Sequence, residues 1–404
     1  MYKAHKVRLE PTNKQATGLS RAAGTARFAY NWALARWGEQ YDAFKKGERD
    51  AQPNALALRR ELNALKREEF PWMMESTKCA PQEAIINLGK AFDNFFKKRG
   101  KYPTFKKRGQ HDSFKLSTGQ FDVGTDEHGN PRLRVPKVGW IRMSETPRFT
   151  GDAVSVTVSR RAGQWFASLM FNVEDTAAVT PSSEDVVGID LGARELVLSN
   201  GDRLQVPREY RRAERQLRRA QQVLSRKQNG SKNRAKARDR VARLHYRTAC
   251  VRENWQHQVT SRLVKDFGTV VIEDLNVSGM VKNRCLAKSV SDVGFGELRR
   301  QIEYKAASSG VTVVVADRWF PSSKTCSVCG TKTKSLPLHI REWDCSGCGT
   351  HHDRDLNAAV NLRNLAVSST VSACGEFLSS APSQDVPVLA QDTLVKQEPD
   401  SEVA

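Results

Sequence analysis

Long apolar runs, acidic residues and cysteines outside one cluster are scarce in this sequence. No apolar run reaches the roughly 18 residues that a membrane-spanning helix needs, and the N-terminal residues contain no apolar signal core. The 404 residues are 39% hydrophobic and 27% charged, which is typical of a globular protein with more than one domain. We therefore expect a cytoplasmic protein without a membrane partner, associated with the nucleoid of a bacterium or archaeon.

The shortage of acidic residues points to a polyanionic partner. The chain has 65 Lys and Arg against 45 Asp and Glu, which gives a net charge of +20. Such an excess favours binding to nucleic acid or to a lipid surface, although a basic surface that only aids solubility is the alternative. Residues 203–247 contain 16 basic and 3 acidic side chains, on two helices predicted at about 208–227 and 232–266. We expect this helix pair to lie along a nucleic-acid backbone through Arg211, Arg212, Arg218 and Arg219.

A second basic segment spans residues 97–108. Seven of its twelve residues are basic, none is acidic, and two aromatic residues interrupt the run. Basic side chains neutralise phosphates and aromatic rings stack on unpaired bases, whereas a solvated loop is the alternative. The candidate nucleic-acid-binding residues are Lys97, Lys98, Arg99, Lys101, Tyr102, Lys106, Lys107 and Arg108.

Hydrophobic periodicity predicts two regions of different class. In the N-terminal half we expect a strand at 5–10, helices at about 13–41, 54–69 and 81–99, and strands from 113 to 175 with a hairpin turn at 160–163. The strands could close a small β-barrel around the helices. The third helix has an apolar stripe predicted to be core: Ile85, Leu88, Phe92, Phe95 and Phe96.

The C-terminal half has the alternation of an α/β sheet. Strands are expected at 186–192, 195–198, 203–206, 269–273 and 311–316, with helices at about 296–308 and 354–364. The tail after about residue 368 is rich in Ser, Pro and acidic residues, and we expect it to be disordered.

Two of the predicted strands end in an acidic residue. Asp190 lies in the apolar run Val186–Gly192, where a buried charge requires a cationic partner. Glu273 ends the strand at 269–273. Because the carboxyl ends of neighbouring strands meet at one edge of an open α/β sheet, we expect these two carboxylates to lie together. Asp274 is an alternative to Glu273, which could instead cap the following loop.

A third carboxylate lies in His352-Asp-Arg-Asp-Leu-Asn-Ala-Ala-Val-Asn361. Helical spacing places Asp355 on the face of Ala358, Ala359 and Leu362, which is small and apolar and can pack on a sheet. Asp353 fits better as a helix cap. Three such carboxylates can hold two divalent ions, one activating water and the other stabilising the leaving 3′ oxygen of a phosphodiester. Hard oxygen ligands select Mg²⁺ or Mn²⁺.

Four of the eight cysteines form a zinc-binding pattern. Two Cys-x-x-Cys pairs, each followed by Gly, are separated by fifteen residues. The expected ligands are Cys326, Cys329, Cys345 and Cys348. Because four thiolates leave no position for water, the zinc would be structural; a redox pair is the alternative. We expect His351 and His352 to be surface residues rather than ligands.

In combination these motifs resemble the TnpB family, the insertion-sequence nucleases related to miniature type V CRISPR effectors. The resemblance covers nearly the whole chain to about residue 365. The stretches that carry it are Val7–Thr12, Arg27–Asn31, Gly188–Gly192, Ile272–Asn276, Ser289–Asp292, Phe320–Cys326 and His352–Asn361.

The resemblance implies an α/β and β multidomain protein: an RNase H-like (RuvC) nuclease domain with an inserted zinc ribbon, and a β-barrel wedge domain carrying a helical recognition lobe. The implied boundaries are 1–12 and 105–180 (wedge), 13–104 (lobe), 181–318 and 351–370 (nuclease), 319–350 (ribbon, binding target nucleic acid) and 371–404 (tail). Asp190, Glu273 and Asp355 fall on the catalytic positions of the family.

The implied activity is RNA-guided DNA cleavage beside a short transposon-adjacent motif, with a guide RNA from the transposon end and double-stranded target DNA as partners. Lys78 and Gln82 are candidates for recognising that motif, and a monomer with its RNA is expected. Two alternatives remain open: a nuclease-inactive RNA-guided repressor, and a DNA-strand transferase acting in transposition.

Overall fold

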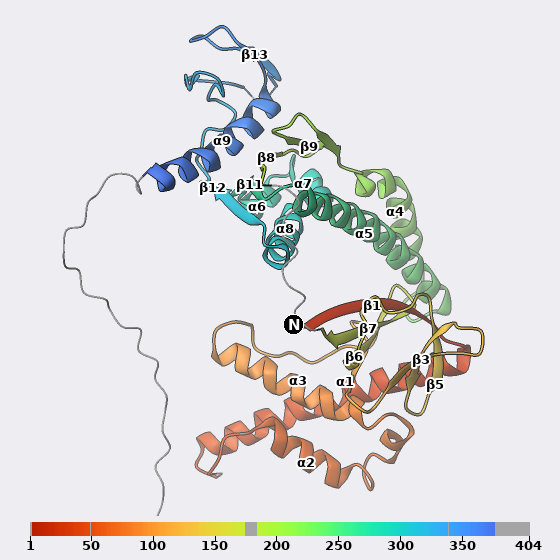
Figure 1. The fold of residues 1–404 in the computed structure, drawn as a ribbon. Helices are drawn as coiled ribbons and strands as arrows, with labels where there is room; N and C mark the ends of the chain where they lie inside the picture. Colours follow the sequence, from red (N-terminus) through yellow and green to blue (C-terminus); the bar gives the residue numbers. More distant parts are fainter. Residues whose placement is uncertain (1, 49, 174–183, 338, 376–404) are drawn as a thin grey trace, which may run out of the picture. The chain divides into compact units, whose positions relative to one another are not determined.

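The computed structural model describes residues 2–48, 50–173, 184–337 and 339–375 (Figure 1). By packing, the chain divides into two compact units. Unit 1 comprises Met1–Thr180, Val206–Arg262 and Val277–Gly310, and unit 2 comprises Pro181–Gln205, Leu263–Asn276 and Val311–Ala404. None of the helices in the described segments combines the length and apolar character needed to cross a bilayer. These two units are defined by packing, whereas the five predicted domains are defined by function, so the predicted domain boundaries stay a prediction. The tail was predicted to be disordered from about residue 368, but the C-terminal helix continues to Gly375, and the rest of the tail lies outside the described residues.

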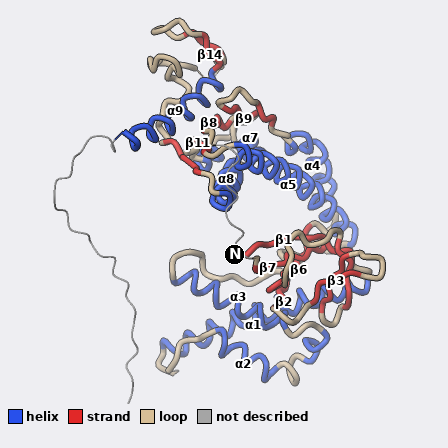
Figure 2. Tube along the Cα trace, viewed as in Figure 1, coloured by secondary structure: helices blue, strands red, loops and turns tan. Residues whose placement is uncertain are grey.

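A seven-stranded antiparallel sheet forms the centre of unit 1, in the order β2-β6-β7-β1-β5-β4-β3 (Figure 2). The predicted turn at 160–163 is confirmed, because β6 and β7 are joined by Ala162 and Gly163, whose φ angles of 52° and 83° suit a two-residue hairpin. The strands are β1 (Tyr2–Glu10), β2 (Ser113–Ser117), β3 (Asp122–Thr125), β4 (Pro131–Val135), β5 (Gly139–Met143), β6 (Ala153–Arg161) and β7 (Gln164–Asn172).

The prediction of a closed β-barrel is wrong for the described strands. β2 and β3 are the two edges of an open sheet and do not pair with each other. The apolar side chains of the sheet instead share one core with those of three helices, for example Leu116 and Leu169 with Leu19 and Leu88. Because helices cover its apolar face, the sheet buries that face without curling until its edges meet.

The helices of this core are α1 (Asn13–Lys45), α2 (Ala55–Leu65) and α3 (Cys79–Phe96), with a short 3₁₀ helix, η1 (Pro71–Glu75), before α3. A capping box begins α1: the Thr12 hydroxyl accepts from the Gln15 N–H at 3.4 Å, and the Gln15 side chain accepts from the Thr12 N–H at 3.0 Å. In the predicted stripe of α3, Ile85, Leu88 and Phe92 are buried. Phe96 was wrongly placed in the core, since it is the last residue of α3 and is 59% exposed.

Unit 1 also contains α4 (Glu209–Ser225), most of α5 (Lys232–Asp266), α6 (Val277–Lys282), α7 (Ala287–Val293) and α8 (Phe295–Ser309). Leu217 and Ala220 are the buried residues of α4. The two short helices α6 and α7 were not predicted. One of them completes α4: buried Asp292 of α7 accepts from the backbone N–H of Tyr210 at 3.0 Å, which satisfies an end group of α4.

Unit 2 contains a five-stranded sheet in the order β10-β9-β8-β11-β12. β8, β11 and β12 are parallel, whereas β9 runs antiparallel to β8. The bounds are β8 (Val186–Leu191), β9 (Glu195–Leu198), β10 (Arg203–Gln205), β11 (Thr269–Glu273) and β12 (Thr312–Ala316). A two-stranded ribbon, β13 (Glu342–Asp344) and β14 (His351–Asp353), precedes α9 (Arg354–Gly375). All five strands were predicted to within about one residue.

Helix α9 packs directly on the middle strand of this sheet. A Cβ atom added to Gly188 of β8 would lie 2.0 Å from the Ala359 carbonyl oxygen and 2.5 Å from the Arg363 nitrogen. Only glycine allows two backbones to approach this closely. Gly188 therefore determines how near the start of α9 can come to the strand that carries Asp190.

Candidate functional site

The strand register of unit 2 brings Asp190 beside Glu273. Ile189 of β8 pairs with Ile272 of β11, so the residue that follows each of them lies at the same carboxyl edge of the sheet. Both carboxylates are only partly exposed. The predicted proximity of the two acidic residues at neighbouring strand ends is therefore present in the structure.

Asp355 joins this group from the second position of α9. The prediction that the face of α9 with Ala358, Ala359 and Leu362 packs inward is confirmed, because all three residues are buried. Asp353 acts as the helix cap, as predicted, since its Oδ1 accepts from the Leu356 N–H at 2.8 Å. Its other oxygen pairs with Arg203 at 2.8 Å.

The three carboxylates interact electrostatically. Burial, followed by the negative charges of Glu273 and Asp355, raises the pKa of Asp190 to about 8, against opposing effects of Arg354 and Arg341. A cation placed among these groups would remove the penalty on ionised Asp190. Oxygen-donor side chains with a deficit of positive charge suit a divalent ion with hard-ligand preference, although the oxygens of these three carboxylates do not converge among the described residues as those of a formed metal site do.

Two neighbouring side chains hold the other two carboxylates. Arg341 Nη1 donates to both oxygens of Asp355, at 3.1 and 3.2 Å, and the Ser322 hydroxyl donates to Glu273 Oε1 at 2.7 Å. Asp274, the alternative to Glu273, pairs with Arg318 at 2.5 Å. Neither Arg341 nor Ser322 was predicted from the sequence as a site residue. Ser322 lies in a stretch that carries the family resemblance, whereas Arg341 has no local pattern that marks it.

Two buried asparagines, also missed, connect α9 to the segment that follows β12. The side-chain nitrogen of Asn361 donates to the carbonyls of Ser322 and Thr325, at 2.7 and 2.6 Å, and Asn357 donates to the Thr325 carbonyl at 2.8 Å. The Asn357 oxygen accepts from the Ser327 N–H at 2.9 Å. These bonds tie the loop that carries Ser322 to the helix that carries Asp355.

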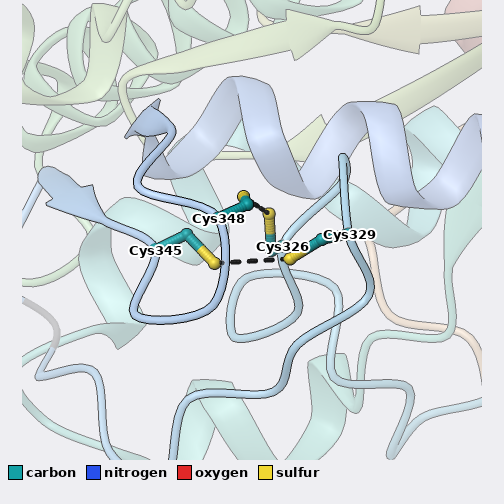
Figure 3. A group of neighbouring side chains, drawn as sticks. All are labelled: Cys326, Cys329, Cys345 and Cys348. Carbon is teal, nitrogen blue, oxygen red and sulfur yellow. Dashed lines mark hydrogen bonds between the residues drawn. The ribbon is translucent and has the colours of Figure 1, made fainter.

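The four predicted cysteines converge on one point (Figure 3). Their sulfur atoms all lie within 4.8 Å of one another, with Cys326 and Cys348 at 3.7 Å and Cys329 and Cys345 at 3.5 Å. Among the described residues, this is the one group of three or more His, Cys, Asp or Glu side chains whose ligand atoms converge in this way. Four thiols at this separation fit a tetrahedral Zn²⁺ ion.

The two Cys-x-x-Cys pairs have the same backbone conformation and the same backbone hydrogen bond. Gly330 and Gly349 have φ angles of 75° and 72°, and each donates its N–H to the carbonyl of the first cysteine of its pair, at 3.0 and 2.8 Å. A residue with a side chain is disfavoured at such angles, which accounts for the glycine after each pair.

The placement of His352 on the surface was wrong. The residue is 7% exposed, and its Nε2 lies 3.0 Å from Cys326 Sγ. Its ring packs on Trp343, with ring centroids 4.9 Å apart. His351 is exposed as expected and pairs with Asp344 at 2.7 Å. The alternation of a strand explains the difference, because consecutive residues of β14 point to opposite faces.

The predicted nucleic-acid-binding residues all lie in unit 1, and no contact among the described residues gathers them into one site. Arg211, Arg212, Arg218 and Arg219 are exposed on α4, with Arg211 donating to Ser289 at 2.7 Å and Arg212 to Glu209 at 2.9 Å. Lys78 immediately precedes α3 and is exposed, whereas Gln82 is partly buried.

The segment at 97–108 is exposed apart from Pro103. Two of its candidates are engaged within unit 1. Lys106 Nζ lies 3.9 Å from the centroid of the Tyr30 ring, and the Tyr102 ring makes edge contacts with Phe92 and Phe95. The other six basic residues of the segment are exposed: Lys97, Lys98, Arg99, Lys101, Lys107 and Arg108.

Comparison with known proteins places the chain in a family. Residues 295–362 match the sequence family described as "Cas12f1-like, TNB domain", residues 168–284 match "Probable transposase" of IS605 OrfB type, and residues 1–46 match "Helix-turn-helix domain". In the structure, residues 2–45 form one strand and one continuous helix.

A Streptomyces pristinaespiralis protein named "Putative RNA-guided DNA endonuclease" is 40% identical over 98% of this chain and 96% of its own length. The Escherichia coli K12 protein "Putative RNA-guided DNA endonuclease InsQ" is 33% identical over 93% and 95% of the two chains. Cas12f1 in its complex with guide RNA and target DNA has the same fold, with a TM-score of 0.55 at 15% identity over 90% of this chain and 99% of that chain. The chain therefore belongs to the TnpB family, the IS605 OrfB-type proteins related to miniature type V CRISPR effectors.

Proposed function

We propose that the protein is an RNA-guided DNA endonuclease of an insertion sequence, cutting DNA beside a transposon-adjacent motif by metal-dependent hydrolysis of a phosphodiester. The observation that carries this proposal is the electrostatic coupling of Asp190 to Glu273 and Asp355 at one edge of the unit 2 sheet. Relatives that match nearly the whole chain are named for the same activity, which supports the proposal.

Each of the three carboxylates has a distinct place in the proposed site. Asp190, on the strand between β9 and β11, is the best placed to contact two metal ions, while Glu273 and Asp355 would each complete one side. Two bound Mg²⁺ or Mn²⁺ ions would supply an activated water and stabilise charge on the leaving 3′ oxygen, which leaves a 5′ phosphate. Ser322 and Arg341 would orient the flanking carboxylates through the bonds described above.

The proposed partners are a guide RNA from the transposon end and a double-stranded DNA target, bound by a monomer of the protein. The net charge of +20 supports a polyanionic partner. The exposed arginines of α4 and the basic segment at 97–108 are the proposed contacts to phosphates. The four cysteines would hold a structural zinc ion that stabilises the ribbon beside α9.

Sequencing the RNA that copurifies with the protein tests the guide. We expect a defined transposon-end RNA with a variable 3′ segment, and its absence would contradict an RNA-guided activity. A target complementary to that segment should then be cut by the wild-type protein in Mg²⁺. If the protein binds the target without cutting it, the repressor alternative is favoured. If the 3′ ends of the cut DNA are joined to new DNA, the strand-transferase alternative is favoured.

Two substitutions test the site, one in β8 and one at the start of α9. Asp190→Ala and Asp355→Ala should each abolish cutting while RNA and target binding persist. Asp353→Ala is the matched control, because loss of a helix cap costs about 1 kcal/mol of stability without removing a metal ligand. Cutting at the wild-type rate by Asp355→Ala, with loss in Asp353→Ala, would reverse the assignment.

A further inference from the structure

Trp319 is more exposed than any other large apolar side chain in the described segments. It is 85% exposed, whereas Val328 and Tyr2, the next two, are 68% and 67% exposed. A tryptophan exposes a large apolar area, so its ring is usually at least partly covered. An exposed indole ring is able to stack on a flat partner such as a nucleic-acid base.

The loop that carries Trp319 is held on both sides of the ring. Arg318 pairs with Asp274 at 2.5 Å, and Phe320 packs against the core formed around Val271 and Leu362. The Trp319 N–H donates to Asp317 Oδ1 at 2.8 Å. The ring is thus directed outward by a fixed backbone with anchored neighbours.

This loop also lies at the proposed catalytic edge. Ala316, three residues before Trp319, is the register partner of Glu273. Ser322, three residues after it, donates to the Glu273 carboxylate at 2.7 Å. Three residues extend at most about 11 Å, so Trp319 emerges within that reach of a backbone position paired with Glu273.

We propose that Trp319 is a stacking platform for an unpaired base of the DNA strand that enters the catalytic site, an inference that rests on the proposed function. Pairing of a guide with one DNA strand leaves the other strand unpaired, and each unpaired base exposes a flat aromatic face. Stacking of that face on the indole ring would position the neighbouring phosphodiester at the carboxylates. Because every base has such a face, the contact suits a strand of any sequence.

Three variants of Trp319 distinguish an effect of aromatic stacking from an effect of side-chain size. In the RNA-loaded full-length protein, Trp319→Ala and Trp319→Leu should slow single-turnover cutting of a complementary target by about five- to a hundredfold. Trp319→Tyr should stay within about threefold, because it keeps an aromatic plane. Target binding and zinc content should be unchanged in all three. Equal rates for Leu and Trp would overturn the inference.

A photocrosslink tests the contact itself. The cleavage-deficient Asp190→Ala protein is loaded with RNA and with a target carrying 5-iodouracil in the strand that the guide displaces. After irradiation and trypsin digestion, the adduct should lie on the peptide 319–324, which trypsin releases between Arg318 and Lys324. Adducts elsewhere, with guided cutting intact in the wild type, would overturn the role of Trp319 and leave the proposed function standing.

The remaining outcomes are equally decisive. If Trp319 is covered by a second copy of the chain, Trp319→Ala would convert a dimer to a monomer in size-exclusion chromatography with light scattering, which contradicts the proposal. If the wild-type protein cuts no guided target, the proposed function itself fails, and this result is distinct from a missing adduct in a protein that cuts.

Discussion

Unit 2 contains two groups of side chains suited to metal ions, and they are assembled in opposite ways. The four cysteines come from one short segment, and repeated backbone hydrogen bonds at Gly330 and Gly349 shape both halves of their cluster. The three carboxylates come from two strands and a helix far apart in the sequence. They are brought together by the β8–β11 register and by the close approach of α9 to Gly188.

The two groups also differ in what holds their ligand atoms. The cysteine sulfurs converge on one another, whereas Asp355 and Glu273 are bonded to Arg341 and Ser322. A converging site is suited to a permanently bound ion, and a site held by exchangeable polar partners is suited to ions that arrive with a substrate. From this difference we predict a structural zinc site and a catalytic metal site. Zinc content should depend on the cysteines and on His352, whereas cleavage and Mg²⁺ affinity should depend on the carboxylates and on pH.

The largest effect is expected from removal of a cysteine ligand. Structural zinc contributes about 10–16 kcal/mol of binding free energy in zinc-finger peptides, so Cys326→Ser should lose the zinc and unfold the ribbon. Metal analysis should fall from one zinc per chain to none, and limited proteolysis should cut within residues 319–350. Cys285→Ser, at an exposed cysteine outside the cluster, is the control. Full zinc content in Cys326→Ser would contradict the ligand assignment.

The next largest effect concerns the choice between two adjacent acidic residues. Glu273→Gln should lower the cleavage rate by more than about 1,000-fold, because a lost metal ligand removes several kcal/mol of transition-state stabilisation. Asp274→Asn should stay within about tenfold, since Asp274 pairs with Arg318. Single-turnover cleavage measures both. The opposite order of effects would assign the site to Asp274.

A smaller effect should come from the neighbour of a zinc ligand. His352 lies 3.0 Å from Cys326 Sγ, and loss of such an outer contact typically lowers metal affinity about 10- to 100-fold. His352→Ala should therefore release zinc to a chelator at lower concentration than the wild type. His351→Ala should match the wild type, because His351 is exposed and faces away in the strand. Equal chelator sensitivity in the two variants would show that His352 contributes packing alone.

The smallest expected effect is a gradual change of Mg²⁺ affinity with pH. Because the pKa of Asp190 is raised to about 8, its carboxyl is mostly protonated at neutral pH without a divalent ion. Mg²⁺ binding should then release a proton, and Mg²⁺ affinity should rise by up to about tenfold per pH unit until about pH 8. Calorimetry in buffers of different ionisation enthalpy measures the released proton. An affinity that does not change from pH 6 to 9 would contradict the shift.

The same shift has a consequence for stability. The folded state holds a proton that the unfolded chain releases near the ordinary pKa of 3.8, so the contribution of Asp190 is fully present below that pH and is lost as the pH rises through about 8. The thermal midpoint of the metal-free wild type should therefore fall over this range relative to Asp190→Asn, which cannot ionise.

Most elements of unit 2 could be predicted because their sequence patterns are local. The apolar runs at 186–191 and 269–273 are long enough to indicate buried strands, and the small apolar face of α9 indicated its orientation. In unit 1, the short helices α6 and α7 were not predicted, since six or seven residues carry too little periodicity. The open sheet of unit 1 was mistaken for a barrel, because strand patterns show which residues face a core but not what covers them.

The sequence by itself determined the cluster of four cysteines, the acidic residues at the ends of β8 and β11, and the packing of the Asp355 side of α9 on the sheet. Each depends on spacing within a few residues, which local backbone geometry converts directly into position. Only the tertiary structure decided that Arg341 and Ser322 hold two of the carboxylates, that His352 lies against Cys326, and that the Trp319 side chain is exposed. These contacts join segments distant in the chain, and their free energy depends on packing that no local pattern records.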